Sequence, residues 1–258
     1  MNPVLARNVL IHNEIERISN ECVRNNIKLI LLKGAALIEL FPEYSFEREM
    51  EDVDILIEKE NYIKFIKILK KLGYSEVPYD PNAMYNENLG LKIDISTKLW
   101  YLTDRQNKKI MNQAIRINNF YVLPMQEILR HIIYHMYFEH NFEFKKWNND
   151  VRILIQYGAE IDFRIPTFVR RLMNTKVFYK GHIIKLLVLP WGAKVKYIIE
   201  KFFPTDSFLF RRYSNMRNLS VLFPLVLFYR WVRLVYNTIK LTNNLITYLF
   251  SKLSLVNS

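Results

Sequence analysis

The chain contains a single cysteine, Cys22, among its 258 residues. No internal disulfide can therefore form, and the helical pattern around Cys22 predicts a packing role in a reducing compartment. The strongest apolar run, residues 219–229, is followed at once by Arg230 and Arg233. It is much shorter than the roughly 20 residues that span a bilayer. Residues 1–13 show no signal-peptide pattern, so we expect a cytoplasmic protein.

Acidic residues are also missing from the end of the chain, because none follows Asp206. Residues 1–125 hold 17 Lys plus Arg against 17 Asp plus Glu, whereas residues 126–258 hold 20 against 8, which together give the net charge of +12. Such an excess predicts an anionic neighbour for the second half of the chain: nucleotide phosphates, nucleic acid or an anionic membrane surface. A solvated basic face is the alternative.

The apolar pattern, with half of all residues apolar, predicts a globular α+β protein. A small mixed sheet with flanking helices is expected in residues 1–123, and an all-helical domain in residues 124–258. In the first part we expect helices and strands at these positions: helix 3–26, strand 27–32, a turn at Gly34 into helix 35–40, strand 52–57, helix 62–71 closed by Gly73, and short strands 74–77, 83–86 and 90–96.

Three aspartates in apolar strands carry the chemistry. Asp52 and Asp54 alternate with Val53 in one predicted strand, so both carboxylates leave the same face. If Asp94 lies on a neighbouring antiparallel strand, its carboxylate comes within about 4.5 to 8 Å of that pair. Carboxylates this close repel one another unless a cation is present, and a hard divalent ion with oxygen ligands removes the conflict. Magnesium is the expected ion.

The motif Leu31-Leu32-Lys33-Gly34-Ala35-Ala36, followed by Arg48, Asp52-Val53-Asp54 and the lone Asp94, resembles the nucleotidyltransferase fold of the DNA polymerase beta superfamily. Within that superfamily the pattern is similar to an uncharacterised bacterial nucleotidyltransferase family. The resemblance covers roughly residues 25–165, because His131, His135 and the segment ending at Asp150 are similar to the helical region of that family.

The resemblance implies an enzyme that moves a nucleoside monophosphate from an NTP to a hydroxyl acceptor and releases pyrophosphate. Asp52, Asp54 and Asp94 would hold two Mg²⁺ ions, with Mn²⁺ as a possible substitute, and Asp94 would also take the acceptor proton. The nucleotide phosphates would be bound by Lys33, Gly34, Ala35 and Arg48. The acceptor would face a wall formed by Ser96, His131, His135 and Asp150.

Two positions depart from the expected pattern. The superfamily usually has Gly-Ser or Gly-Gly where this chain has Gly34-Ala35, so a hydroxyl that could bind a triphosphate oxygen is missing. Backbone amides at the following helix start could still bind phosphate. The family often has His where Ser96 follows the third aspartate, which leaves the acceptor open: a sugar, an antibiotic, a protein hydroxyl or an RNA end.

Other functions are compatible with parts of the sequence. A non-catalytic protein of this fold could bind nucleotide or nucleic acid, and residues 207–258 could attach a membrane-peripheral assembly factor to lipid or to a partner helix. His131 and His135 are four residues apart and would ligate zinc only if Glu139 or His140 joined them. We therefore expect core or substrate-lining histidines. Nothing in the chain predicts sequence-specific DNA recognition.

Overall fold

A computed structural model describes residues 2–77, 80–139, 145–161 and 180–203, with scattered positions between residues 225 and 247. The chain divides into two compact units, residues 1–163 and 164–258. The predicted boundary after residue 123 falls inside the first unit. The helices that directly follow Pro124 therefore belong to the same compact unit as the sheet.

The first unit is an α+β fold, as predicted. Within the described residues, seven strands form one mixed sheet in the order β3-β4-β5-β2-β1-β7-β6. The neighbours β2 and β5 are parallel, as are β1 and β7, and the remaining pairs are antiparallel. The strand bounds are β1 Ile30–Leu31, β2 Asp52–Leu56, β3 Ser75–Glu76, β4 Ala83–Asn86, β5 Leu91–Ser96, β6 Ile115–Ile117 and β7 Phe120–Val122.

Helices surround this sheet in the first unit. Their bounds are α1 Pro3–Arg24, α2 Lys33–Leu40, α3 Tyr62–Lys71, α4 Asp104–Asn112, α5 Met125–Glu139 and α6 Lys145–Gln156, with short 3₁₀ turns η1 Pro42–Phe46 and η2 Lys59–Asn61. The helices predicted at residues 3–26 and 62–71 are confirmed to within two residues. Asn2 caps α1 by accepting from two backbone amides, and Gly73 follows α3 with a φ of +88°, which favours glycine.

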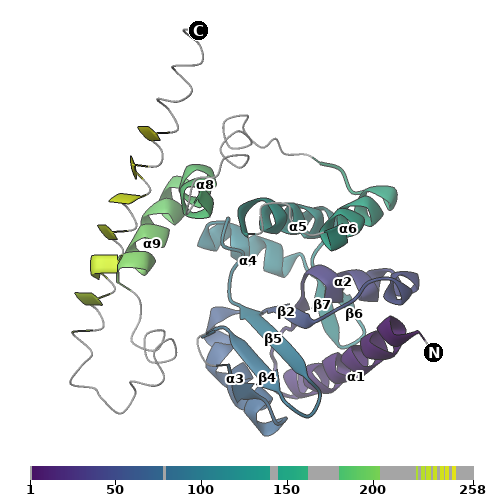
Figure 1. Ribbon diagram of the computed structural model, residues 1–258. Coiled ribbons are helices and arrows are strands. Elements are labelled where there is room, and N and C mark those ends of the chain that lie inside the picture. Colours follow the sequence, from purple (N-terminus) through teal and green to yellow (C-terminus); the bar gives the residue numbers. More distant parts are fainter. Residues whose placement is uncertain are drawn as a thin grey trace. The chain divides into compact units, whose positions relative to one another are not determined.

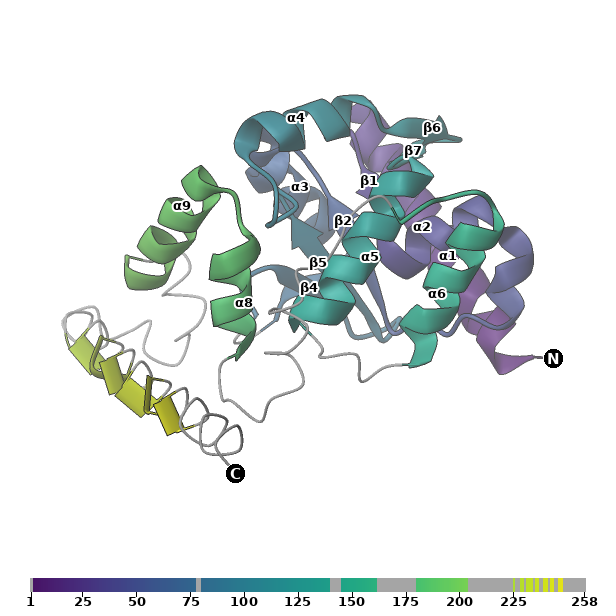
Figure 2. The same ribbon diagram turned by 90° about the horizontal axis from the view of Figure 1, so that it is seen from above.

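Two layers of helices lie on opposite sides of the sheet in the first unit (Figures 1 and 2). Helices α1 and α3 lie side by side on one side, and α4, α5 and α6 lie on the other. The apolar residues of the central strands are fully buried, among them Val53, Ile55, Ile93 and Ile95. Cys22 is part of the same core, where burial raises the pKa of its thiol to about 12, and its predicted packing role is confirmed.

One predicted pairing is wrong. Asp94 was expected on a strand antiparallel to that of Asp52 and Asp54, but β5 runs parallel to β2. A parallel neighbour requires a crossover connection, and here the crossover consists of α3 and the strands β3 and β4. The expected meander of three short strands exists, but it places β5 back alongside β2 in the same direction.

Residues 104–122 form elements that the sequence reading left unassigned. Thr103 begins α4 with a capping box, since its hydroxyl accepts from the Gln106 amide and the Gln106 side chain accepts from the Thr103 amide. After α4, the strands β6 and β7 form a hairpin whose turn contains Asn118 with a φ of +51°. Strand β7 pairs with β1 and so extends the sheet beyond the motif that carries Gly34.

The second unit contains the helices α8 Lys180–Val188 and α9 Trp191–Phe202. Pro190 directly precedes α9, which agrees with the expectation of a helical break there. In the portion of the chain that the structure describes, no helix is both long and apolar enough to cross a membrane. The predictions for residues 207–258 lie, apart from the scattered positions, outside the described residues.

Candidate active site

The two central strands bring the three aspartates onto one face of the sheet. Asp54 of β2 is the register partner of Asp94 of β5, and Asp52 is the partner of Lys92. Adjacent strands are about 4.8 Å apart, so the carboxylates of Asp54 and Asp94 begin from neighbouring backbone positions. Because side chains alternate, Asp52 leaves the same face as Asp54. These four side chains are all partly exposed, whereas Val53 and Ile93 between them are buried.

Two lysines partly neutralise these carboxylates. The Lys33 ammonium lies 2.7 Å from Oδ1 of Asp54. The Lys92 ammonium lies 2.8 Å from Oδ1 of Asp94 and 3.0 Å from Oδ2 of Asp80. Asp52 is paired with neither lysine. The face therefore carries three carboxylates and two lysine ammonium groups. This arrangement suits a polyanionic ligand that binds together with metal ions.

The acidity of Asp94 is perturbed by its surroundings. Burial and, to a smaller extent, the charges of Asp54 and Asp52 raise the pKa of Asp94 to about 6, against the opposing effect of Lys92. Burial disfavours the charged carboxylate, and neighbouring like charges add to that effect. The site thus stores electrostatic repulsion that an added cation would relieve.

A metal ion is compatible with the donor chemistry of this face. Carboxylate oxygens are the ligands that Mg²⁺ prefers, and repulsion among Asp52, Asp54 and Asp94 favours a divalent ion. As the side chains stand, no group of three or more His, Cys, Asp or Glu residues in the described segments is arranged to hold a metal. The Lys33 ammonium contacts Oδ1 of Asp54, and the Lys92 ammonium lies within 3.1 Å of both oxygens of Asp94. The two predicted ions stay a prediction.

Helix α2 begins directly beside the carboxylates. Leu32 at its N-cap donates its amide to the carbonyl of Asp54, and its apolar side chain provides no cap for the first turn of the helix. The amides of the first turn are suited to bind an anion, because they lack helical acceptors. The side chain of Ala35 packs in the core, since the residue is 2 % exposed. Only its backbone amide could bind a ligand.

The turn that leads into α2 differs from the expected one. A tight turn was predicted at Gly34, but the left-handed residue is Lys33, with a φ of +48°. Gly34 is required for a different reason. A Cβ atom built on it would lie 3.0 Å from Nη2 and 3.2 Å from Cζ of Arg48. The guanidinium group therefore packs directly on the backbone of Gly34.

Arg48 itself is buried and forms an ion pair. Its Nε donates to Oδ1 of Asp150 over 2.7 Å and its Nη2 to Oδ2 over 3.1 Å. The Tyr44 hydroxyl donates to Oδ1 of the same carboxylate, and burial together with that charge raises the pKa of Tyr44. Arg48 was predicted to contact the triphosphate, and Asp150 to line the acceptor wall. In the structure the two side chains bind each other, and Asp150 is fully buried.

The remaining predicted wall residues occupy different environments. Ser96 ends β5, is exposed, and by alternation shares the face of Lys92 and Asp94. His131 and His135 of α5 are both buried. Their rings extend a row of aromatic side chains, since His131 stacks on Tyr101 at 6.0 Å and His135 meets Trp147 edge-on at 5.0 Å between ring centroids.

Sequence reasoning missed the residues that continue this row. Trp100, Tyr101 and Tyr134 pack against one another between the segment after β5 and α5, with 4.6 Å between the ring centroids of Tyr101 and Tyr134. The adjacent aromatic pair Trp100-Tyr101, four residues after Ser96, was the available signal. Trp100 and Tyr134 are partly exposed, unlike the two histidines.

Comparison with known proteins identifies the family of this chain. Residues 2–180 match the family described as "Uncharacterised nucleotidyltransferase". The chain belongs to this nucleotidyltransferase family. No curated protein matches it. One similar solved structure is the solution structure of the antibiotic-resistance factor ANT(2'')-Ia, with 13 % sequence identity, 77 % of this chain and 95 % of that chain covered, and a TM-score of 0.44. As a member of its family, this nucleotidyltransferase acts on a nucleotide and a hydroxyl-bearing acceptor.

Proposed function

We propose that this nucleotidyltransferase is magnesium-dependent and binds an NTP at the face formed by Asp52, Asp54 and Asp94. The observation that supports it most directly is the register of the central strands, which pairs Asp54 with Asp94 and keeps Asp52 on the same side. The hydrogen bond from the Leu32 amide to the carbonyl of Asp54 holds the amino end of α2 beside these residues. Carboxylates for cations and amides for phosphate are thus adjacent.

The described side chains suggest how the phosphates would be bound. The Lys33 ammonium lies 2.7 Å from Oδ1 of Asp54. If Asp54 holds a metal ion, Lys33 would contact a phosphate oxygen bound to that ion. The amides of Gly34 and Ala35 point from the first turn of α2, where the helix dipole favours negative charge. Magnesium, when bound, would neutralise charge on the phosphates and on the departing pyrophosphate.

The reaction would be an in-line displacement at the α-phosphorus. A bond forms between the acceptor oxygen and the α-phosphorus while the bond from that phosphorus to the oxygen bridging the α- and β-phosphates breaks. The proton of the acceptor hydroxyl passes to the carboxylate of Asp94, which is near Ser96 on the exposed end of β5. Lys33 would offset the charge that develops on the pyrophosphate. Ser96 is exposed and Trp100 and Tyr134 are partly exposed, so these side chains could contact the acceptor.

The test compares wild-type protein with Asp52→Ala and with Glu87→Ala, an exposed acid in the turn between β4 and β5. Each is incubated with the four α-labelled ribonucleoside triphosphates, magnesium and cell extract, and label transfer is measured. We expect Asp52→Ala to reduce label transfer by at least about a hundredfold, because it removes a carboxylate that would bind the metal ions on the phosphates. We expect Glu87→Ala to retain label transfer. Chelation by EDTA should abolish transfer, and Mn²⁺ should restore it at least in part.

Equal transfer by wild type and Asp52→Ala would overturn the assigned site. Transfer that persists in EDTA would overturn metal dependence alone. Binding of labelled nucleotide without any transfer, weakening steeply with salt, would instead support a non-catalytic nucleotide-binding protein of the same fold.

A further inference from the structure

We propose that Arg48 is a positioning residue, which fixes the Gly34 turn of the nucleotide site to helix α6 through a buried ion pair with Asp150. The proposal rests on the proposed function of the Gly34 turn in phosphate binding. It assigns to Arg48 a role different from a direct phosphate contact.

The backbone of Arg48 is held in place before its side chain acts. Asn8, a buried residue of α1, donates from Nδ2 to the carbonyl oxygens of both Ser45 and Arg48 at 2.7 Å. The Arg48 amide donates to the carbonyl of Tyr44. The segment between η1 and β2 is therefore attached to α1 on its backbone side, which leaves the guanidinium group to reach the other way.

The guanidinium group then contacts two other parts of the unit. Two of its N–H groups bind both oxygens of Asp150 in α6, and Nη1 donates to the carbonyl of Glu49 at 2.5 Å. Its Nη2 and Cζ atoms also lie against Gly34, where even a methyl group would be crowded. One planar group thus touches the start of α2 and the side of α6, elements more than a hundred residues apart in the chain.

Burial favours a positioning role over a phosphate contact. The side chain of Arg48 is 7 % exposed and that of Asp150 is 0 % exposed, and a buried ion pair seldom stabilises a fold more than apolar residues of the same size would. The fork of arginine matches a carboxylate in two places, which fixes direction as well as distance. The role of the pair is therefore to position other groups, and the group that it positions is the backbone at Gly34.

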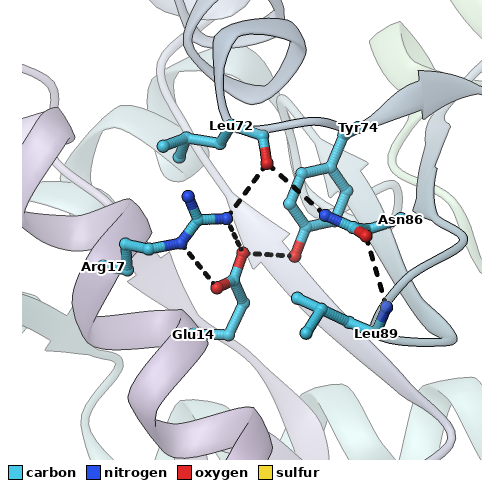
Figure 3. Close-up of polar contacts among 6 residues, drawn as sticks. All are labelled: Glu14, Arg17, Leu72, Tyr74, Asn86 and Leu89. Carbon is cyan, nitrogen blue, oxygen red and sulfur yellow. Dashed lines mark hydrogen bonds and ion pairs between the residues drawn. The ribbon is translucent and has the colours of Figure 1, made fainter.

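A second arginine–carboxylate–tyrosine network provides a matched control. In Figure 3, Arg17 donates to both oxygens of Glu14, and the Tyr74 hydroxyl donates to Oε1 of Glu14 at 2.9 Å. Arg17 also donates to the carbonyl of Leu72. This network uses the same three chemical groups, but it joins α1 to the segment after α3 and contacts neither Gly34 nor the aspartate face.

The experiment measures binding of magnesium tripolyphosphate, a probe of phosphate recognition that does not depend on the base, by calorimetry on the full chain. Asp150→Asn is the decisive variant, because it removes a negative charge without changing shape. If Arg48 bound phosphate directly, this change would leave affinity unchanged or raise it. We expect a loss of about tenfold for Asp150→Asn and for Arg48→Lys, the range seen when residues supporting a site are replaced, and unchanged affinity for Glu14→Gln.

The outcomes separate the two proposals. Unchanged or tighter binding by folded Asp150→Asn would overturn the positioning role while leaving the proposed function intact. Failure of wild type to bind the probe, with no Asp52-dependent label transfer, would overturn the proposed function and this inference with it. If Asp150→Asn does not fold, as judged by circular dichroism, Tyr44→Phe replaces it, with an expected loss of about threefold from one missing hydrogen bond. Unchanged affinity in folded Tyr44→Phe would then overturn the positioning role.

Discussion

The two arginine–carboxylate–tyrosine networks of the first unit have the same chemistry in different surroundings. Arg17 binds a carboxylate three residues away on its own helix, and its side chain is 45 % exposed. Arg48 binds a carboxylate 102 residues away, and its side chain is 7 % exposed. Glu14 is itself buried, with 7 % of its side chain exposed, but its partner Arg17 lies on the same helix and can reach water. In the Arg48–Asp150 pair both partners are buried and lie on distant elements, so each partner fixes the element that carries the other.

The largest difference between the networks is expected when the carboxylate alone is removed. Asp150→Ala leaves the buried Arg48 charge without its main partner, so we expect the free energy of unfolding to fall by about 3–5 kcal/mol. Glu14→Ala leaves Arg17 able to reach water, so its cost should be about 1–3 kcal/mol, mainly from the buried Tyr74 hydroxyl. Urea unfolding followed by circular dichroism measures both. Equal losses would show that burial does not distinguish the networks.

Replacing Gly34 by alanine tests the contact that only the Arg48 network makes. We expect Gly34→Ala to destabilise the protein by about 1–3 kcal/mol, because the added methyl group crowds the guanidinium. The matched control is Gly192→Ala in α9, where a Cβ atom meets nothing within 4 Å and φ is not positive. That change should be neutral or stabilise by up to about 1 kcal/mol.

A double-mutant cycle sharpens this test. If the guanidinium causes the crowding, Gly34→Ala should cost less when Arg48 is already alanine, and the measured coupling should exceed about 0.5 kcal/mol. Additive losses in urea unfolding would assign the requirement for glycine to some other feature of the turn.

Asp94 provides a third case, a carboxylate held by lysine among like charges. Its folded pKa of about 6 lies above the usual 3.8, so the folded state binds this proton more tightly than the unfolded state does. Stability from this group is therefore present at low pH and is lost as pH rises from about 4 to 6. In metal-free buffer at pH 7.5 we expect Asp94→Asn to be more stable than wild type by about 1–2 kcal/mol. The gap should close near pH 4 in urea unfolding. A persistent gap at pH 4 would point to packing instead of charge.

The smallest effect is expected from the two tyrosines. Tyr44→Phe and Tyr74→Phe each remove one hydrogen bond to a carboxylate, at 3.1 and 2.9 Å, so each should lower the free energy of unfolding by about 1 kcal/mol. Thermal unfolding should therefore not separate them, whereas tripolyphosphate binding should weaken only in Tyr44→Phe. Weakening in both variants would mean that the probe reports general loosening of the fold.

The sequence predicted the elements whose signal is local. Helices α1 and α3 show apolar residues at helical spacing, and β2 and β5 show aspartates alternating with buried aliphatic residues, so each could be assigned from its own segment. The direction of β5 relative to β2 was predicted wrongly, because direction is decided by the path of the connection and not by the strand's residues. Hairpin β6–β7 was missed because its strands have only three residues each.

The placement of individual site residues shows the same limit. The pattern grouped Asp52, Asp54, Asp94 and Lys33, and the structure places them on adjoining strands and on the turn beside them; their role stays a prediction. It could not show that Arg48 would meet Asp150, since their contact depends on how α6 packs beside α2 and η1. The sequence analysis missed Trp100, Tyr101 and Tyr134 for a similar reason. These rings lie in a turn and on a helix, and their contacts form only when the fold brings the turn and the helix together.

The parallel register of β2 and β5 limits where residues can be inserted into or deleted from the chain. A slip by one residue would turn Asp94 into the apolar layer and expose an isoleucine in its place, so neither strand tolerates an insertion or deletion. The crossover between them reaches the surface at the turn from Glu87 to Gly90, which is exposed apart from half-buried Leu89. That turn is held by hydrogen bonds, because Arg7 donates to the carbonyl oxygens of Leu89 and Gly90 at 2.7 and 2.6 Å. An insertion there should cost those bonds but leave the spacing within each strand unchanged.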